Sequence, residues 1–165
     1  MADPFDFEKP ARYAVMGNPV AHSKSPRIHA LFAHQFRHHI EYTAIQVDAG
    51  GFAQAVEQFR ANGGAGLNIT VPFKQEAFKL ADHLSDRARI AQAVNTLRFE
   101  PDGRLFGDNT DGAGLVHDLD KNLGVPLKDR RILLPGAGGA GRGVLAPLLK
   151  HHPARVVIAN RTLSK

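Results

Sequence analysis

The stretch Asn68-Ile69-Thr70-Val71-Pro72-Phe73-Lys74 places two polar side chains on one face of an apolar strand and a lysine just past its end. Because side chains alternate along a strand, Leu67, Ile69 and Val71 share one face while Asn68 and Thr70 share the other. A strand buried on both faces reads as a near-continuous apolar run, so we expect the polar face to look into a polar cavity. Pro72 ends the strand because it has no N–H to donate, and Lys74 then opens a short helix at the rim of the cavity. Open α/β sheets bind ligands there, outside the carboxyl ends of their strands.

The composition is that of a globular protein without disulfides. The chain has 165 residues, 43% of them hydrophobic and none of them cysteine, which excludes thiolate metal sites and cysteine nucleophiles. Its length suffices for one domain plus part of a second. No apolar run is long enough to span a bilayer, and residues 1–8 are acidic where a signal peptide is basic and then apolar. We therefore expect a cytoplasmic protein with no membrane partner.

The formal net charge of +5 is concentrated in the second half of the chain. Residues 121–165 hold nine Lys and Arg against one acid, Asp129, which gives +8 and leaves −3 for the first 120 residues. A basic second half suits an anionic ligand. Alternatively, the segment belongs to a domain whose acids lie further on. Nucleic acid is not the expected partner, because residues 121–165 contain no aromatic side chain on which bases could stack.

Strands alternate with helices along the sequence, which is typical of βαβ units and a mainly parallel sheet. Ser25 and Pro26 are expected to cap and open the first helix, and Thr110 or Asp111 to cap a later one. The predicted strands are 13–17, 40–47, 67–71, 131–135 and 155–159, with a hairpin of 96–99 and 104–106. The predicted helices are 25–36, 51–60, 74–81, 86–92, 110–122 and a last one that runs from the glycine-rich stretch to 149. We place a domain boundary near residue 110, between residues 1–110 and residues 111–165.

A glycine-rich loop predicts a dinucleotide site in the second segment. Gly136, Gly138 and Gly141 follow a predicted strand directly, open a helix and precede another strand. The first glycine permits a tight turn, the second lets backbone N–H groups approach a pyrophosphate, and the third lets the helix pack close to the strand. We therefore assign residues 136–141 to cofactor binding, that is, Gly136, Ala137, Gly138, Gly139, Ala140 and Gly141. A glycine-rich turn without a ligand is the alternative.

The end of the second strand of this unit indicates which dinucleotide binds. An NAD site usually has Asp or Glu there, about 20 residues past the loop, to bind the ribose hydroxyls. Here the strand ends in Asn160, Arg161 and Thr162. Since an arginine can pair with a 2′-phosphate and stack on adenine, we expect NADP instead of NAD. A solvated arginine after a strand is the alternative.

The remaining polar residues each have a structural explanation when taken singly. Ser25 and Asp111 can be helix caps, Asn95 a turn residue and Lys74 a solvated helix charge. His34 and His38 have the spacing of a helical metal pair, but no third ligand stands out in the sequence. We therefore expect no metal.

Taken together, these residues resemble the shikimate dehydrogenase family. The resemblance rests on six blocks that match in order and in spacing: residues 17–26, 68–74, 93–96, 107–112, 136–141 and 160–162. It implies a reversible, NADP-dependent reduction of 3-dehydroshikimate to shikimate, in aromatic amino-acid biosynthesis. It also implies an N-terminal α/β substrate-binding domain, followed by the start of a Rossmann-like doubly wound dinucleotide-binding domain.

The resemblance assigns roles to individual residues. Ser23 and Ser25 are expected to bind the substrate carboxylate, and Thr70, Asn95 and Asp111 to hold the ring hydroxyls. Lys74 is the expected catalytic proton carrier, coupled to Asp111 as its partner, since hydride transfer from a carbinol carbon needs loss of the hydroxyl proton. No metal takes part, and the resemblance leaves a homodimer open.

Only two strands of the nucleotide-binding domain can be found in the sequence, whereas a doubly wound domain has around six. We therefore expect a truncated domain, poor order in the second segment unless a neighbour covers it, and no measurable turnover by the 165-residue chain. A truncated, inactive module that binds shikimate is thus an alternative to the dehydrogenase. A dual quinate/shikimate dehydrogenase is a second alternative, against which Ser23, Ser25 and Arg161 speak.

Overall fold

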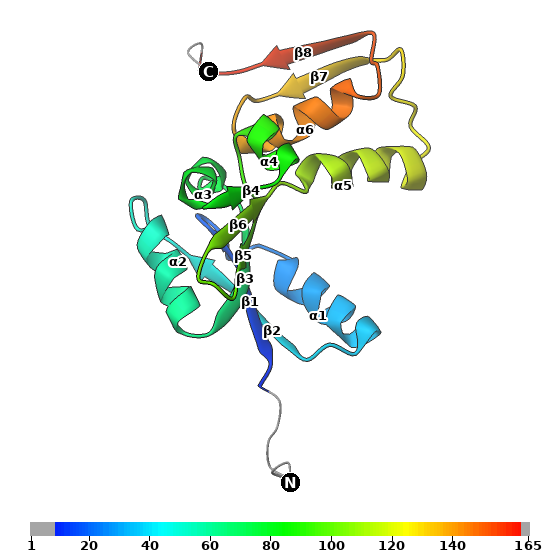
Figure 1. Ribbon diagram of the computed structural model, residues 1–165. Helices are drawn as coiled ribbons and strands as arrows, with labels where there is room; N and C mark the ends of the chain where they lie inside the picture. The colour runs from blue at the N-terminus through cyan, green and yellow to red at the C-terminus, as the bar shows by residue number, and fades with distance from the viewer. Residues whose placement is uncertain (1–8, 163–165) are drawn as a thin grey trace.

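Strands and helices alternate along most of the chain, as the sequence predicts. The computed structural model describes residues 9–162 (Figure 1), so residues 1–8, with the acidic start, and residues 163–165 lie outside the described residues. In chain order the elements are β1 (Ala11–Gly17), α1 (Ser25–Phe36), β2 (Ile40–Gln46), α2 (Phe52–Ala61), β3 (Gly64–Ile69), α3 (Lys74–Leu80), β4 (His83–Leu84), α4 (Asp86–Ala91), β5 (Thr96–Phe99), β6 (Leu105–Asp108), α5 (Asp111–His117), η1 (Asp118–Asn122), β7 (Arg131–Pro135), α6 (Gly139–Leu149) and β8 (Arg155–Ala159).

The larger of two sheets has six strands in the order β2-β1-β3-β5-β6-β4. β1 pairs in parallel with β2 and β3, and β4 pairs in parallel with β6. β5 runs antiparallel to both β3 and β6, and β5 and β6 form the predicted hairpin. The sheet is therefore mainly parallel, which confirms the predicted α/β class.

Three local predictions differ from the structure. β3 ends at Ile69, two residues earlier than predicted, and Val71 is 54% exposed instead of sharing the buried face of Leu67 and Ile69. The chain already turns at residues 71–73, so the alternation of side chains no longer holds there. The two-residue strand β4 was not predicted, because so short a segment shows no periodicity. The helix expected to reach Asn122 does so, but its last part, η1, is a π-helix.

The predicted helix caps are confirmed only in part: Thr110 is the N-cap residue of α5, but neither α1 nor α5 has a side-chain hydrogen bond from its N-cap residue. Ser25 is the first residue of α1, and its backbone N–H donates to the Ser23 Oγ at 3.3 Å. Neither Thr110 nor Asp111 caps α5 with its side chain; the Asp111 N–H donates to the Asn109 Oδ1 at 3.2 Å. In both helices a side chain two positions upstream accepts the hydrogen bond from the backbone N–H of the first residue. The side chains of Ser25 and Asp111 are therefore available for other contacts.

The core lies on the face of the large sheet that α2, α3 and α4 cover. Buried residues of the strands, among them Met16, Leu67 and Leu97, pack there against side chains of these helices. Phe52 of α2 and Phe73, just before α3, stack with ring centroids 5.0 Å apart, and both are 1% exposed. Figure 1 shows α1 on the opposite side of the strands from α2. Because Phe73 is buried in this core, the start of α3 at the next residue, Lys74, is held against the sheet.

The second sheet consists of β7 and β8, paired in parallel and connected by α6. α6 packs against α5 and α4 and also contacts α3, so this βαβ unit rests on the end of the large sheet (Figure 1). Leu133 and Val157 of its strands are 65% and 47% exposed. Among the described residues, no helix is both long and apolar enough to cross a bilayer.

Candidate functional site

The candidate site lies where β1 and β3 end, at the carboxyl edge of their parallel pair. A Cβ on Gly17 would come within 2.3 Å of the Thr70 methyl group, so only glycine allows Thr70 to lie so close to β1. The Thr70 N–H donates to the Met16 carbonyl at 2.9 Å, and the Asn18 N–H donates to the Val71 carbonyl at 2.9 Å. The two loops that leave these strands are thus held together, which fixes Thr70 at the site.

Three predicted residues meet by direct hydrogen bonds. The Lys74 Nζ lies 2.5 Å from the Asp111 Oδ2, and the Asn95 Nδ2 donates to the Asp111 Oδ1 at 2.9 Å. The side chains of Lys74 and Asp111 are 11% and 24% exposed, so their charges are partly withdrawn from water. We call Lys74, Asn95 and Asp111 the polar trio. It combines an amine that can carry a proton with an amide and a carboxylate that can bind hydroxyl groups.

The backbone around Lys74 is anchored from two directions. Phe73 is buried against Phe52, and the Lys74 carbonyl accepts a hydrogen bond from the Val94 N–H at 2.8 Å. The Asn95 carbonyl accepts from the Ile69 N–H at 2.7 Å, so the segment before β5 is tied to the end of β3. Two members of the polar trio therefore stand on rigid backbone, as a site that must hold a fixed geometry requires.

Asp111 is held by Asn109, which Asp108 supports in turn, and the sequence assigned no role to either residue. Asn109 is 2% exposed; its Nδ2 donates to the Ala93 carbonyl at 2.9 Å while its Oδ1 accepts from the Asp111 N–H. Asp108 accepts hydrogen bonds from the Arg87 side chain, from the Ser85 Oγ at 2.5 Å and from the Asn109 N–H at 2.7 Å. The only signal in the sequence for Asp108 and Asn109 was their place in the block 107–112. From the sequence, a buried polar residue in a turn cannot be told from an exposed one in a loop.

Arg87 and its hydrogen bonds lower the pKa of Asp108 below its usual range, against the opposing effect of burial. A depressed pKa stabilises the fold above the ordinary carboxyl pKa, and this stabilisation is lost as the pH falls through the lowered value. Arg87 is half exposed, so we expect Asp108→Asn to cost about 1–2 kcal/mol at neutral pH. Urea unfolding at neutral and acidic pH checks this: the difference from wild type should vanish in acid. A pH-independent difference would contradict it, and Asp86→Asn, at a 93% exposed side chain, is the control.

Ser23 and Ser25 lie on the loop after β1 and at the start of α1. Both are half-buried, and among the described residues neither makes a direct hydrogen bond to the polar trio. Behind them, the Tyr42 hydroxyl donates to the Asn68 Oδ1 at 2.6 Å, and the Tyr42 ring stacks on His29 with centroids 4.2 Å apart. Burial raises the pKa of Tyr42 to about 12, and a hydrogen bond with the Ser25 side chain opposes that rise.

Tyr42 and His29 are therefore neighbours of the site that the sequence did not indicate. Burial also lowers the pKa of His29, against the effect of its hydrogen bond with Asn68. Asn68 lines a cavity of about 320 Å³ beside Tyr42, but Thr70 does not line it. The polar strand face thus does border this cavity, at Asn68.

The glycine loop has the shape that the sequence predicts. Gly136 has a φ of 120°, in the region that favours glycine, and a Cβ on Gly141 would lie 2.3 Å from the Gly136 carbonyl oxygen. A Cβ on Gly138 would meet nothing within 4 Å, so its backbone faces open space. The Asn160 Oδ1 accepts from the Ala137 N–H at 3.2 Å and ties the loop to the end of β8.

These residues fit a dinucleotide. A cavity of about 450 Å³ lies between the loop and the residues after β8 and is lined by Pro135, Gly136, Gly138, Ala159, Asn160, Arg161 and Thr162. Arg161 is exposed there. One turn into α6, Arg142 donates from Nη1 to the Gln92 Oε1 at 3.1 Å, while its Nε is buried without a protein partner among the described residues. A phosphate is bound by backbone N–H groups and cationic side chains, and the open backbone at Gly138 and the nearby arginines provide both kinds of group.

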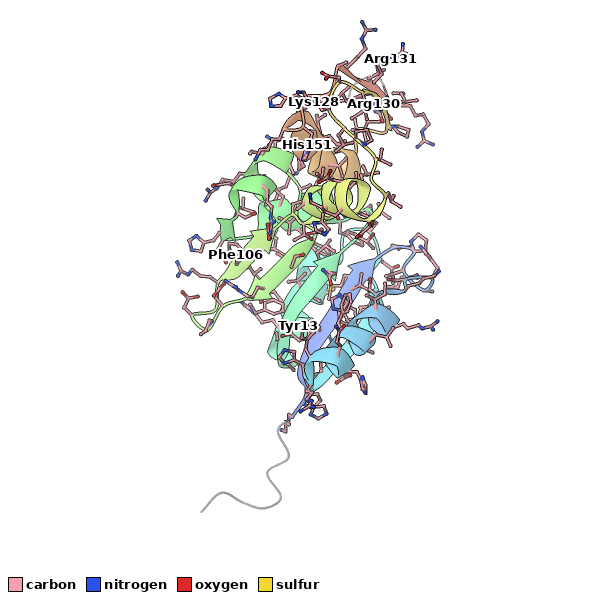
Figure 2. All side chains as sticks on the ribbon, turned by 90° about the vertical axis from the view of Figure 1, so that its right-hand side faces the viewer. Tyr13, Phe106, Lys128, Arg130, Arg131 and His151 are labelled. Carbon is pink, nitrogen blue, oxygen red and sulfur yellow. The ribbon has the colours of Figure 1, made fainter. Side chains whose placement is uncertain are left out.

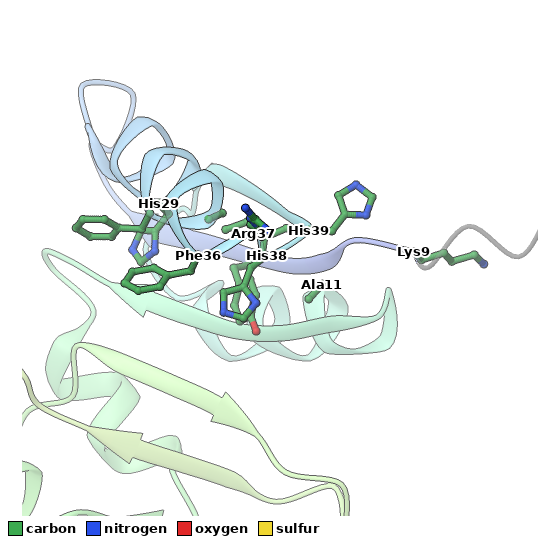
Figure 3. A pocket seen from close by; sticks show the side chains of 11 residues that line it. Lys9, Ala11, His29, Phe36, Arg37, His38 and His39 are labelled. Atoms are coloured by element: carbon green, nitrogen blue, oxygen red, sulfur yellow. The ribbon is translucent and has the colours of Figure 1, made fainter.

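Two other features of the described structure lie apart from this site. A cavity of about 620 Å³ lies at the opposite end of the large sheet, at the start of β1 and the end of α1, where Lys9, Arg37 and His38 border it (Figure 3). Figure 2 shows Lys128, Arg130, Arg131 and His151 together at the end of the molecule beyond α5. Within residues 9–162, no group of three or more His, Asp or Glu side chains is placed to hold a metal ion.

Comparison with known proteins agrees with this geometry. A family model described as the shikimate dehydrogenase substrate binding domain matches residues 15–97. A shikimate dehydrogenase (NADP(+)) of Hahella chejuensis is 59% identical over 153 residues, which is 93% of this chain and 56% of the relative. The chain thus spans about half the length of the curated relatives it matches.

Solved structures extend the likeness to the fold. The crystal structure of an Ael1 enzyme from Pseudomonas putida has 52% identity and a TM-score of 0.82, covering 93% of this chain and 56% of that one. The shikimate 5-dehydrogenase of Thermus thermophilus, solved in complex with NADP(H) and shikimate, has 38% identity and a TM-score of 0.83, covering 93% of this chain and 57% of that one. The family model spans half of the sequence, from β1 to β5, and so this chain belongs to the shikimate dehydrogenase family.

Proposed function

We propose that this chain provides the substrate site and the first cofactor-binding elements of an NADP-dependent shikimate dehydrogenase, which interconverts shikimate and 3-dehydroshikimate. The observation that carries the proposal is the polar trio beneath the helix of the glycine loop. A proton carrier, Lys74, and a hydroxyl-binding carboxylate, Asp111, stand next to the element that binds a dinucleotide phosphate. The curated relatives are named for the same reaction.

The residues divide the chemistry between them. A bound NADP would supply the hydride acceptor for the carbinol carbon of shikimate. The neutral Lys74 amine takes the proton of the same hydroxyl, and in the reverse direction the Lys74 ammonium returns it to the ketone oxygen. Asp111 stabilises the ammonium and, with Asn95 and Thr70, orients the ring hydroxyls. Ser23 and Ser25 bind the carboxylate.

We also propose that a boundary between two functional domains lies near residue 110. The six-stranded sheet lies entirely before it, and the glycine loop lies in the separate two-stranded sheet after it. Residues 1–110, together with Asp111 at the boundary, then bind the substrate, and residues 111–165 begin the NADP site. Quinate as a second substrate is not favoured, because Ser23, Ser25 and Arg161 fit shikimate and NADP.

Ligand binding to the isotope-labelled 165-residue chain tests the proposal. We expect shikimate to shift the amide signals of Ser23, Thr70 and Asn95, and NADP to shift those around Gly138. Arg161→Ala removes the partner of the 2′-phosphate, so NADP should bind roughly 10–150-fold more weakly while NAD binding stays the same. Quinate binding as tightly as shikimate would favour the dual enzyme. Absence of any response to shikimate, or equal loss of both cofactors, would refute the corresponding part.

A further inference from the structure

The first two turns of α6 lie directly on the polar trio. Two of its glycines make this possible, and both lie outside the three positions, 136, 138 and 141, that define the dinucleotide loop. They are Gly139, the first residue of the helix, and Gly143, one turn later. Any side chain at these positions would strike the residues that hold the site, as the following distances show.

Gly143 is buried against the support of Asp111. A Cβ there would lie 2.8 Å from the Asn109 Oδ1, 3.0 Å from its Nδ2 and 3.2 Å from the Asp111 Oδ2. Asn109 cannot give way, because it is 2% exposed and its amide already binds the Ala93 carbonyl and the Asp111 N–H. The Asp111 Oδ2 is the same oxygen that binds the Lys74 amine. An added methyl group would therefore push on that oxygen or move α6.

Gly139 makes the corresponding contact with Lys74. A Cβ on Gly139 would lie 2.9 Å from the Lys74 Cβ, at the rigid base of that side chain. The close contact is completed from the other side by Gly112 of α5, where a Cβ would lie 2.4 Å from the Gly143 carbonyl oxygen. Three glycines on two helices thus bring the backbone of α6 against Lys74 and Asp111 and shield the pair from water.

We propose that Gly139 and Gly143 are positioning residues: they seat the helix of the cofactor loop on the Lys74–Asp111 pair, so that the position of α6 fixes the amine and the carboxylate. The inference builds on the proposed function, in which this pair binds the substrate and moves its proton. It adds a link between the cofactor loop and the proton carrier, through contact of the α6 backbone with the side chains of Lys74, Asn109 and Asp111.

Gly143→Ala in the 165-residue chain tests this link, with Gly114→Ala as the matched control. Gly114 lies in α5, and a Cβ there would meet nothing within 4 Å. Alanine is intrinsically a better helix former than glycine at both positions. A change in Lys74 reactivity in Gly143→Ala but not in Gly114→Ala therefore reports the contact of Gly143 with the site. The readout is the acetylation rate of Lys74, measured by peptide mass spectrometry against the exposed Lys79 of the same helix in the same sample.

We expect Lys74 to react roughly tenfold faster in Gly143→Ala, as overpacking by one methyl group predicts, and at the wild-type rate in Gly114→Ala. A merely structural role would leave the ratio of Lys74 to Lys79 unchanged. If Gly143→Ala does not fold, the same labelling is measured in Gly139→Ala, at the first residue of α6. A folded variant with wild-type labelling of Lys74 would overturn the proposal.

A second measurement separates this inference from the proposed function. Shikimate should bind roughly tenfold more weakly to Gly143→Ala than to wild type, because the displaced carboxylate and amine are its ligands. If the wild-type chain binds no shikimate, the proposed function is refuted. The acetylation rate of Lys74 would still decide the role of the glycines in that case. Faster labelling with unchanged shikimate affinity would show that the glycines only shield the amine and would overturn their role in positioning.

Discussion

Lys74→Ala is expected to lower kcat for NADP-linked oxidation of shikimate by about 10²–10⁴ while the KM for shikimate changes much less. The variant removes the amine that lies 2.5 Å from the Asp111 Oδ2, and no other amine or imidazole belongs to the polar trio. Without it the hydroxyl proton has no carrier as the hydride leaves. It also leaves the Asp111 charge, 24% exposed, without its cationic partner.

The measurement is the appearance of reduced nicotinamide with saturating shikimate and NADP. Because the chain spans about half the length of its curated relatives, it is assayed alone and fused to the second half of the Hahella chejuensis relative. Lys79→Ala, at an exposed position of the same helix, is the control and should behave as wild type. A large rise in KM with an unchanged kcat would mean that Lys74 only binds the substrate.

Phe73→Ala is expected to destabilise the fold by about 3–5 kcal/mol, the usual cost of emptying a buried aromatic site. The Phe73 side chain is 1% exposed and stacks on Phe52 at the base of α3. Removing it leaves a cavity directly behind the backbone that carries Lys74. The same variant should therefore also weaken shikimate binding where the protein remains folded.

Equilibrium unfolding in urea gives this free energy for wild type and variant. Phe32→Ala is the matched control, because the Phe32 ring is 53% exposed on α1 and its loss should cost far less. Equal destabilisation by the two substitutions would contradict the assignment of the core to the face covered by α2 and α3. A loss of shikimate binding without a loss of stability would show that Phe73 contributes to the site and not to the fold.

The sequence by itself determined the elements whose causes are local. Period-two alternation and Pro72 predicted a strand over 67–71 and a helix from Lys74; the structure has the helix from Lys74, whereas β3 already ends at Ile69. The spacing of Gly136, Gly138 and Gly141 between a strand and a helix predicted β7, α6 and β8 with few errors. Such signals work because they act within a few residues: a missing N–H, a permitted positive φ, or the period of a buried face.

The same local signals did not show which of several nearby polar residues satisfies a helix N–H, or where a strand finds its partner. Ser25 and Asp111 look like helix caps, but Ser23 and Asn109 satisfy the free N–H groups instead. Only the tertiary structure shows that Asp111 is thereby free to bind Lys74. The strand β4 has no pattern of its own and exists because β6 offers it a partner.

The site itself depends on contacts that no local pattern encodes. Lys74 and Asp111 are 37 positions apart in the chain, and the resemblance to a family, not their spacing, predicted that they meet. Tyr42 and Gly143 gave no signal, and Asn109 gave none beyond its place in the block 107–112, because a half-buried tyrosine, a helical glycine and a turn asparagine are common anywhere. Their roles follow from how separate helices and strands pack, and packing depends on the shapes of surfaces that are brought together only when the chain is folded. The sequence thus determined which chemical groups are available, and the tertiary structure decided which of them touch.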